Sequence, residues 1–200
     1  MDLFQPLPML RRQPLLRGKA VSLIGVSAIV SDDTAYYFEI AKPRYWRARP
    51  DGTTSIGIGA IGGSIGQSET LLSCLRREVR EEIGARVSLE APERTYLIRG
   101  PAGAAEEDWQ VADAVEIAPS KKRPVPWMVI LFPPRLGGAG TPDWLAICAF
   151  RTRLEGRAEP RDLFGLLSIG RPVLAQFFCW RRVDGGRFAG PARCGGLAHR

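Results

Sequence analysis

Three glutamates in the segment from Gly63 to Ala85 have a spacing that could hold a metal ion. Glu78, Glu81 and Glu82 stand at i, i+3 and i+4, so on a helix they would share a face over an arc of about 100°. Carboxylates so close raise one another's pKa values unless a cation lies among them. All-oxygen ligands suit Mg²⁺ or Mn²⁺ rather than zinc. An ion held there could polarise a pyrophosphate bridge and activate a water molecule.

The surrounding residues predict the helix that would position these carboxylates. Ser68 is a suitable N-cap, and Gly84 stands where a helix would end in a left-handed conformation. Apolar residues between them recur at intervals of three and four and predict one buried stripe, formed by Leu72, Leu75, Val79 and Ile83.

The charged run from Arg76 to Glu82 also has a simpler interpretation, as a solvated helix surface with alternating charges. Gly63, Glu69 and Gly84 at fixed offsets from this run favour the functional interpretation. Arg77 lies four residues before Glu81 and can hold that carboxylate in position. Glu69 is expected to serve the geometry of the loop and helix rather than the chemistry.

The spacing resembles the Nudix box, G-x5-E-x7-R-E-U-x-E-E-x-G-U, in which U is a bulky aliphatic residue. If each of the seven fixed residues has a background frequency of about 1 in 15, a chance match at a given start is on the order of 10⁻⁸. The departure is Ala85, which weakens packing behind the helix more plausibly than it removes catalysis. The fixed positions are all met, by Gly63, Glu69, Arg77, Glu78, Glu81, Glu82 and Gly84.

The resemblance implies an α/β/α sandwich with a mixed sheet and a loop-helix-loop that binds one or more Mg²⁺ or Mn²⁺ ions. It implies that Glu78, Glu81 and Glu82 are metal ligands and catalytic residues, with one of them acting as or orienting the general base. The carbonyl of Gly62 is implied as a further ligand, and Arg77 as part of the catalytic machinery. The implied reaction is attack of water on phosphorus in a nucleoside diphosphate linked to another moiety.

The rest of the chain supplies strands compatible with that fold. The stretch from Ser55 to Gly66 is dense in glycine and is expected to deliver Gly62 to the metal. Residues Leu163 to Phe178 have helical spacing, but their glycines and a proline predict a broken helix. The predicted strands are Val21–Val30, Ala35–Ile40, Arg86–Leu89, Thr95–Arg99, Trp109–Ile117, Pro126–Phe132 and Trp144–Thr152.

The length of 200 residues, 45% of them hydrophobic, allows one domain with extensions. We expect an N-terminal extension over residues 1–19, a hydrolase domain over 20–179 and a flexible tail over 180–200. The extension lacks the apolar segment of a signal peptide, and no stretch is long and apolar enough to span a membrane.

Cysteine and histidine usage argues against other kinds of site. The four cysteines show no CxxC pair, which favours a reduced, cytoplasmic protein. The single histidine, His199, lies in the predicted tail. A zinc site and a histidine-activated nucleophile are therefore not expected.

The net charge of +7 requires basic residues away from the acidic site, such as Arg44, Arg47 and Arg49. Such charge can steer polyphosphates or RNA, or can simply form a basic surface. A small nucleotide substrate is favoured over nucleic acid, and a homodimer is left open. Further basic clusters are Lys121-Lys122-Arg123 and Arg181-Arg182.

Two kinds of residue could complete the site from outside the box. A fourth metal carboxylate could come from Glu106, Glu107, Asp108, Glu155, Glu159 or Asp162. Stacking on a base or sugar could fall to Tyr45, Trp46, Trp109 or Trp127, although aromatic residues in strands more often lie in the core.

The substrate is the least defined feature. Pro101 stands about 16 residues beyond the box end, which resembles the ADP-ribose subgroup of the family, so ADP-ribose or another sugar nucleotide is slightly favoured. The alternatives are hydrolysis of nucleoside triphosphates or RNA 5′ ends, and a non-catalytic nucleotide sensor. Sensor domains usually lose box carboxylates, and here all three remain.

Overall fold

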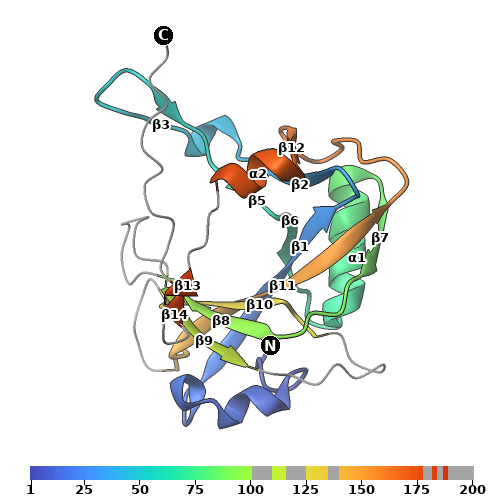
Figure 1. Cartoon of the computed structure of the whole chain (residues 1–200). Coiled ribbons are helices and arrows are strands. Elements are labelled where there is room, and N and C mark those ends of the chain that lie inside the picture. Colours follow the sequence, from blue (N-terminus) through green and yellow to red (C-terminus); the bar gives the residue numbers. More distant parts are fainter. Residues whose placement is uncertain (101–109, 116–124, 135–139, 178–181, 184–186, 189–200) are drawn as a thin grey trace.

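The fold is built on one large mixed sheet. The computed structural model describes residues 1–100, 110–115, 125–134, 140–177, 182–183 and 187–188 (Figure 1). The strands of the sheet are β1 (Val21–Ser31), β2 (Ala35–Ile40), β5 (Ile58–Gly59), β6 (Ile61–Ser64), β7 (Arg86–Leu89), β8 (Thr95–Arg99), β9 (Gln110–Val115), β10 (Met128–Phe132), β11 (Trp144–Glu155) and β12 (Leu166–Gly170).

The central strand pair of the sheet is parallel. β1 lies beside β11 over nearly its whole length, with Val21 opposite Trp144 and Ser31 opposite Arg153. The main order of strands is β12-β2-β1-β11-β10-β8-β9, with β5, β6 and β7 joined to β2, β1 and β11. Parallel and antiparallel pairs therefore coexist, which confirms the predicted α/β class with a mixed sheet.

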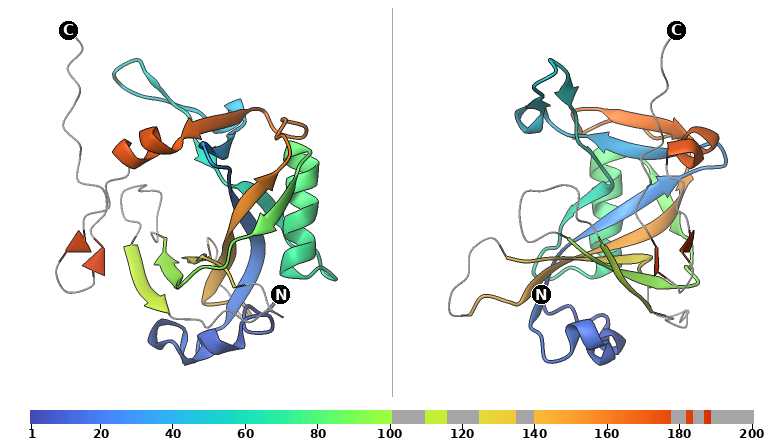
Figure 2. Two further views of the ribbon diagram at one scale, coloured as in Figure 1. Left: turned by 45° about the vertical axis from the view of Figure 1, so that its right-hand side comes forward. Right: turned by 60° about the vertical axis from the view of Figure 1, so that its left-hand side comes forward.

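The main helix, α1 (Leu71–Ile83), packs against β6, β1 and β7 (Figure 2). In the chain, α1 directly follows the glycine-rich strand β6, so one short loop leads from the sheet into the helix. The smaller elements are η1 (Pro8–Arg12), η2 (Pro14–Leu16), η3 (Pro43–Tyr45), α2 (Arg171–Phe177) and the strand pairs β3 (Arg47–Ala48) with β4 (Thr54–Ser55) and β13 (Arg182–Val183) with β14 (Arg187–Phe188).

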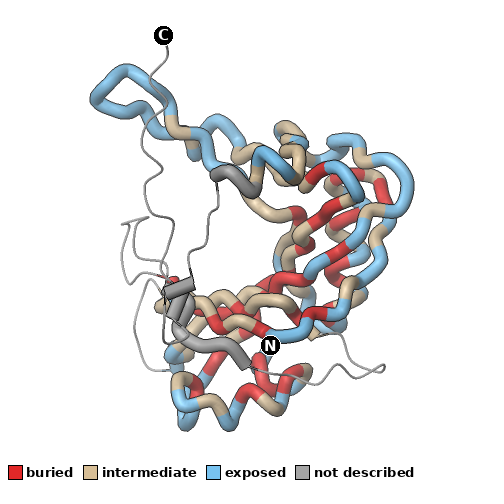
Figure 3. Tube along the Cα trace, viewed as in Figure 1, coloured by how far each residue is buried: buried red, intermediate tan, exposed pale blue. Residues whose placement is uncertain are grey.

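The N-terminal segment contributes to the same hydrophobic core as the sheet and α1 (Figure 3). Its backbone joins β1 through hydrogen bonds from Leu3 N to the Val21 carbonyl and from Leu23 N to the Met1 carbonyl. Because apolar burial is the main source of stability, this segment supports the fold rather than only extending it. Its fully buried leucines are Leu3, Leu7, Leu10 and Leu16.

The strands of the first half were predicted closely, and the last predicted helix was wrong in part. β2 and β7 have the predicted bounds, and β1 is one residue longer than predicted. Within Leu163 to Phe178, residues Leu166–Gly170 instead form β12, which pairs antiparallel with β2. The edge of β2 offers backbone hydrogen bonds to this segment, and only the residues from Arg171 onward form the short helix α2.

In the described part of the chain no helix is long and apolar enough to cross a membrane. The tail predicted over 180–200 lies outside the described residues except for β13 and β14, which pair with each other. A cytoplasmic location and a homodimer stay predictions.

We predict that Asp32→Asn destabilises the turn between β1 and β2. Asp32 Oδ1 accepts hydrogen bonds from the Thr34 and Ala35 amides, and Oδ2 accepts one of 2.6 Å from the Tyr37 hydroxyl. These hydrogen bonds hold the pKa of Asp32 well below its ordinary value, and the bond from Tyr37 has the largest effect. We expect a loss of about 1–2 kcal/mol in the free energy of unfolding near neutral pH, measured by urea denaturation.

The pH dependence provides the check on Asp32. Because the folded pKa is depressed, the stabilisation is present above the unfolded value of about 4 and is lost as the pH falls toward the folded value. The difference between wild type and Asp32→Asn should therefore shrink in acid. Asp33→Asn is the control, since Asp33 makes an exposed ion pair with Arg153 and should cost much less. A difference that is constant with pH would contradict this interpretation.

Candidate active site

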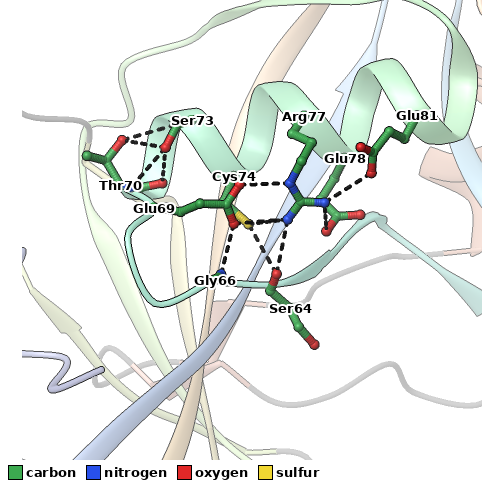
Figure 4. Close-up of polar contacts among 9 residues, drawn as sticks. All are labelled: Ser64, Gly66, Glu69, Thr70, Ser73, Cys74, Arg77, Glu78 and Glu81. Carbon is green, nitrogen blue, oxygen red and sulfur yellow. Dashed lines mark hydrogen bonds and ion pairs between the residues drawn. The ribbon is translucent and has the colours of Figure 1, made fainter.

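Arg77 on α1 joins three of the box carboxylates (Figure 4). Its Nε and Nη2 donate to the two oxygens of Glu69 at 2.7 and 3.0 Å. Its Nη1 donates to Glu78 Oε1 at 2.8 Å and to Glu81 Oε2 at 3.0 Å. The positive charge of the Arg77 guanidinium therefore reduces the repulsion among these three carboxylates. Its contact with Glu81 is the one that the i, i+4 spacing predicted.

Glu69 fixes the loop before the helix, as predicted. Its Oε2 also accepts a hydrogen bond of 2.8 Å from the Gly66 amide. The hydrogen bonds from Arg77, and next that from Gly66, lower the pKa of Glu69 to about 2. Arg77 Nη2 also reaches the Ser64 carbonyl at 3.2 Å, so the arginine ties the helix to the end of β6. The hydrogen bonds between Arg77 and Glu69 are strong because both the donor and the acceptor are charged.

Glu82 has a different environment from Glu78 and Glu81. Its Oε2 accepts a hydrogen bond of 2.8 Å from the Gly62 amide on β6. The pKa of Glu82 is raised to about 7, first by burial and then by the nearby carboxylates of Glu39, Glu78 and Asp162. The Gly62 hydrogen bond opposes this rise. A partly buried carboxylate among other carboxylates is a local excess of negative charge that a cation would relieve.

Glu39, from β2, is a member of this acidic group that the sequence did not reveal. Burial raises the pKa of Glu39, and Lys42 partly offsets the rise. Glu39 lies in β2, opposite Gly59 of β5, and the place of this strand in the sheet brings it toward Glu82. No feature of its local sequence distinguishes it from a surface glutamate.

Asp162 is the predicted outside carboxylate that the fold brings to the box. The segment after β11 crosses the C-terminal end of α1, where Glu159 N donates to the Ile83 carbonyl and Arg161 N to the Glu82 carbonyl. These bonds satisfy carbonyls that a helix end leaves without intrahelical partners. The same crossing brings Asp162 close enough to Glu82 to raise its pKa.

The other outside candidates lie elsewhere. Glu155 lines a cleft between α1 and β7, and Glu159 forms an exposed ion pair with Arg157. Glu106, Glu107 and Asp108 lie outside the described residues. Among the described candidates, Asp162 is thus the one that interacts with Glu82.

The ends of α1 differ partly from the prediction. Thr70, and not Ser68, is the N-cap: it accepts from the Ser73 amide, and Ser73 Oγ accepts from the Thr70 amide in return. This reciprocal pair satisfies two orphan donors, which Ser68 cannot do from two residues upstream. Gly84 ends the helix with φ of 65°, as predicted.

The buried face of α1 also differs from the prediction, at three positions. Leu75, Val79 and Ile83 are buried as predicted, whereas Leu72 is only partly buried. Leu71 and Cys74 join the core instead. Leu71 stands four residues before Leu75 and therefore lies on the same face of the helix.

The aromatic candidates for substrate stacking differ in how far their rings are open to solvent. Trp46 donates its indole N–H to the Ala41 carbonyl and packs edge-on against Phe164 at 5.6 Å between ring centroids. Trp127 packs edge-on against Tyr96. Tyr45 is 61% exposed, with the Arg44 guanidinium 4.8 Å from its ring centroid, and Trp109 lies outside the described residues. Tyr45 is therefore the candidate whose ring is open to solvent.

The carboxylate oxygens of the three box glutamates are ligands of the type that a hard divalent cation prefers, but these oxygens do not converge on one point. In the described part of the chain, no three acidic, cysteine or histidine side chains converge as a metal cluster. Glu78 and Glu81 are turned to Arg77, and Glu82 is turned to Gly62. Carboxylate oxygens beside an exposed helix face fit Mg²⁺ or Mn²⁺, and their convergence requires side-chain rotation away from Arg77.

We predict that Gly63→Ala reduces activity with little effect on stability. A Cβ at Gly63 would overlap the carboxylate of Glu78, which is the mobile end of a side chain and can move aside. The expected result is a fall in kcat of about 10- to 100-fold, from displacement of that carboxylate, with the melting temperature nearly unchanged.

Gly62→Ala is the informative comparison for Gly63→Ala. A Cβ there would overlap the Val26 carbonyl and lie 2.7 Å from the Ser27 Cα, both in the backbone of β1, so this variant should unfold more easily. Gly57→Ala, whose Cβ would meet only the Ala41 side chain at 3.4 Å, is the neutral control. Full activity in Gly63→Ala would show that the position of Glu78 is unimportant.

Comparison with known proteins gives matches among solved structures alone. No family model and no curated protein matches the chain. A Nudix hydrolase from Nitrosomonas europaea is 16% identical, with 78% of this chain and 60% of that chain covered and a TM-score of 0.39. A Nudix-family hydrolase from Clostridium perfringens is 13% identical, with 76% and 83% covered and a TM-score of 0.43.

An ADP-ribose pyrophosphatase from Streptococcus suis is also similar. It is 13% identical, with 74% of this chain and 72% of that chain covered and a TM-score of 0.35. This chain spans less than two thirds of the Nitrosomonas europaea protein.

Proposed function

We propose that this protein is a divalent-metal-dependent hydrolase of the Nudix type, which cleaves a pyrophosphate bond by attack of water. The observation that carries the proposal is the position of Glu82. It is a half-buried carboxylate with a pKa raised to about 7, on the same helix as Glu78 and beside the backbone of β6. A bound divalent cation would compensate the negative charge of this carboxylate and lower its pKa, so the environment of Glu82 favours a cation site.

The proposed metal ligands are the carboxylates of Glu78, Glu81 and Glu82, with the carbonyl of Gly62 as a further donor. Asp162 or Glu39 is the proposed source of a further carboxylate, since both raise the pKa of Glu82. When bound, Mg²⁺ or Mn²⁺ would polarise the phosphate oxygens and lower the pKa of a bound water.

The proposed roles of the remaining groups follow from their contacts. Glu82 would accept or orient the proton of the attacking water. Arg77 would position the carboxylates of Glu78 and Glu81, to which it donates at 2.8 and 3.0 Å. Glu69 would act only through Arg77 and the loop at Gly66.

The proposed substrate class is a nucleoside diphosphate linked to another moiety, with ADP-ribose or another sugar nucleotide slightly favoured. Pro101, on which that preference depends, lies outside the described residues. Tyr45 supports a nucleotide substrate in general terms, because an exposed ring beside an arginine can stack on a base.

Product release from a substrate panel tests the proposal. The panel holds ADP-ribose, sugar nucleotides, dinucleoside polyphosphates, nucleoside triphosphates and triphosphorylated RNA, each with Mg²⁺, with Mn²⁺ and with a chelator. We expect cleavage of a pyrophosphate linkage that requires metal. Binding of nucleotide without turnover of any substrate would instead identify a sensor domain.

A further inference from the structure

A cleft of about 390 Å³ lies on the opposite side of α1 from the proposed metal ligands, between this helix and β7. Arg76, Val79 and Arg80 are displaced by roughly half a turn of the helix from the group formed by Glu78, Glu81 and Glu82. The cleft is lined by Arg76, Val79, Arg80, Ala85, Arg86, Val87, Ser88, Leu89 and Glu155.

The charged rim of this cleft has an excess of positive charge. Arg76, Arg80 and Arg86 face one acidic side chain, Glu155. Within the described part of the chain, none of the three arginines forms an ion pair or a side-chain hydrogen bond. Arg76 and Arg80 stand at i, i+4 on α1, where like charges destabilise a helix. An anion bound between them would remove that cost.

A larger cleft elsewhere lacks this feature. It lies at the N-terminal segment, has a volume of about 800 Å³ and is lined in part by Arg11 and Lys19. Arg11 is paired with Asp2 at 3.0 Å and Lys19 with Asp143 at 3.3 Å. Their charges are already balanced, so the smaller cleft behind α1 is the better anion site of the two.

The floor of the smaller cleft is apolar. Val79 and Ala85 are buried beneath it, and Val87 and Leu89 form its β7 side. Ala85 is 6% exposed and occupies the last position of the box, where the pattern has a bulky aliphatic residue. A larger side chain there would extend into the space that the cleft now provides. The combination of arginines above and apolar side chains below suits an anion that carries an apolar group.

We propose that this cleft binds a small organic phosphate, with the phosphate among Arg76, Arg80 and Arg86 and its apolar part against Val79 and Ala85. Guanidinium groups bind phosphate through paired charge-assisted hydrogen bonds. The site is separate from the proposed active site and requires no metal. A ligand there would contact the helix that carries Glu78, Glu81 and Glu82.

The test uses phenyl phosphate and inorganic phosphate as probes of the full chain in the presence of a chelator. Without a divalent cation the acidic active site repels both probes, so binding reports the cleft. Binding is followed by amide chemical shifts in NMR spectra. We expect the shifts at Val79, Ala85 and Val87, and an affinity for phenyl phosphate at least several-fold above that for inorganic phosphate.

Two variants act on the two halves of the cleft. Arg76→Gln with Arg80→Gln should weaken phenyl phosphate binding by about tenfold or more. Ala85→Leu should weaken it by filling the floor while all three arginines remain. Arg12→Gln with Arg17→Gln removes the same net charge from exposed sites away from the cleft, and should bind as wild type does.

Three results would overturn the proposal. The first is no binding of phenyl phosphate to the wild type up to about 10 mM. The second is an equal loss of affinity in the two double-arginine variants, which would mean attraction by net charge alone. The third is equal affinity for the two probes, which would exclude an organic ligand. Because no turnover is measured, failure of the hydrolase proposal would not affect these results.

Discussion

Replacement of Glu82 by Gln is expected to lower kcat by 10²- to 10⁴-fold, the range of a lost general base or metal ligand. Glutamine keeps the length of the side chain and an oxygen that can accept the Gly62 hydrogen bond of 2.8 Å. It cannot accept a proton from water or contribute charge to a cation. The fold should therefore persist while the chemistry fails. The measurement is steady-state turnover of the best substrate in saturating Mg²⁺.

A stability measurement and a control variant distinguish lost chemistry from unfolding as the cause of the lower kcat. Without metal, Glu82→Gln should be as stable as the wild type or slightly more stable, because burial and three nearby carboxylates disfavour its negative charge. Glu93→Gln removes an exposed carboxylate outside the site and should leave kcat unchanged. Turnover within about threefold of wild type in Glu82→Gln would remove this residue from the proposed chemistry.

Replacement of Arg77 by Met is the second large effect that we expect. Arg77 donates to Glu69, Glu78 and Glu81, and its loss leaves one carboxylate in the loop before α1 and two on the helix without this counter-charge. The side chain of Glu78 is only 12% exposed, whereas that of Glu81 is 54% exposed. Of these two carboxylates, Glu78 is therefore the less solvated and is destabilised more by the loss of Arg77. In the absence of metal, we expect the free energy of unfolding to fall by about 1–3 kcal/mol.

Added Mg²⁺ is the decisive condition for Arg77→Met. A cation bound to the folded state adds stability according to its concentration and affinity. Because the variant has lost its internal cation, Mg²⁺ should raise its melting temperature more than that of the wild type. Arg80→Met, on the same helix but without a described carboxylate partner, should change stability by less than about 0.5 kcal/mol. Equal responses of both variants to Mg²⁺ would contradict the proposed link between Arg77 and the metal site.

The box was predictable from the sequence because its geometry is local. The spacing of Glu78, Glu81 and Glu82 fixes their shared helix face, and the glycine after Ile83 fixes where the helix ends. The i, i+4 relation predicted the Arg77–Glu81 ion pair, which is 3.0 Å long. These features depend on residues within one helix and the loop before it.

The rest of the site depends on long-range pairing and was therefore less accessible. Glu39 reaches the acidic group through β2, and Asp162 through a segment that crosses the end of α1. Neither has a local pattern that distinguishes it from a surface carboxylate. The same cause explains the incorrect part of the last predicted helix, since Leu166–Gly170 form β12 only because β2 provides an edge.

Titration with Mn²⁺, followed by amide signals in NMR spectra, tests the central claim most directly, because a paramagnetic ion broadens signals of nearby nuclei. The claim is that the carboxylates of α1 and the backbone of β6 hold a divalent cation. We predict selective broadening of Gly62, Gly63 and Glu82 at low Mn²⁺, and its loss in Glu82→Gln. Broadening centred elsewhere, or unchanged in the variant, would contradict the proposed metal site and the hydrolase built on it.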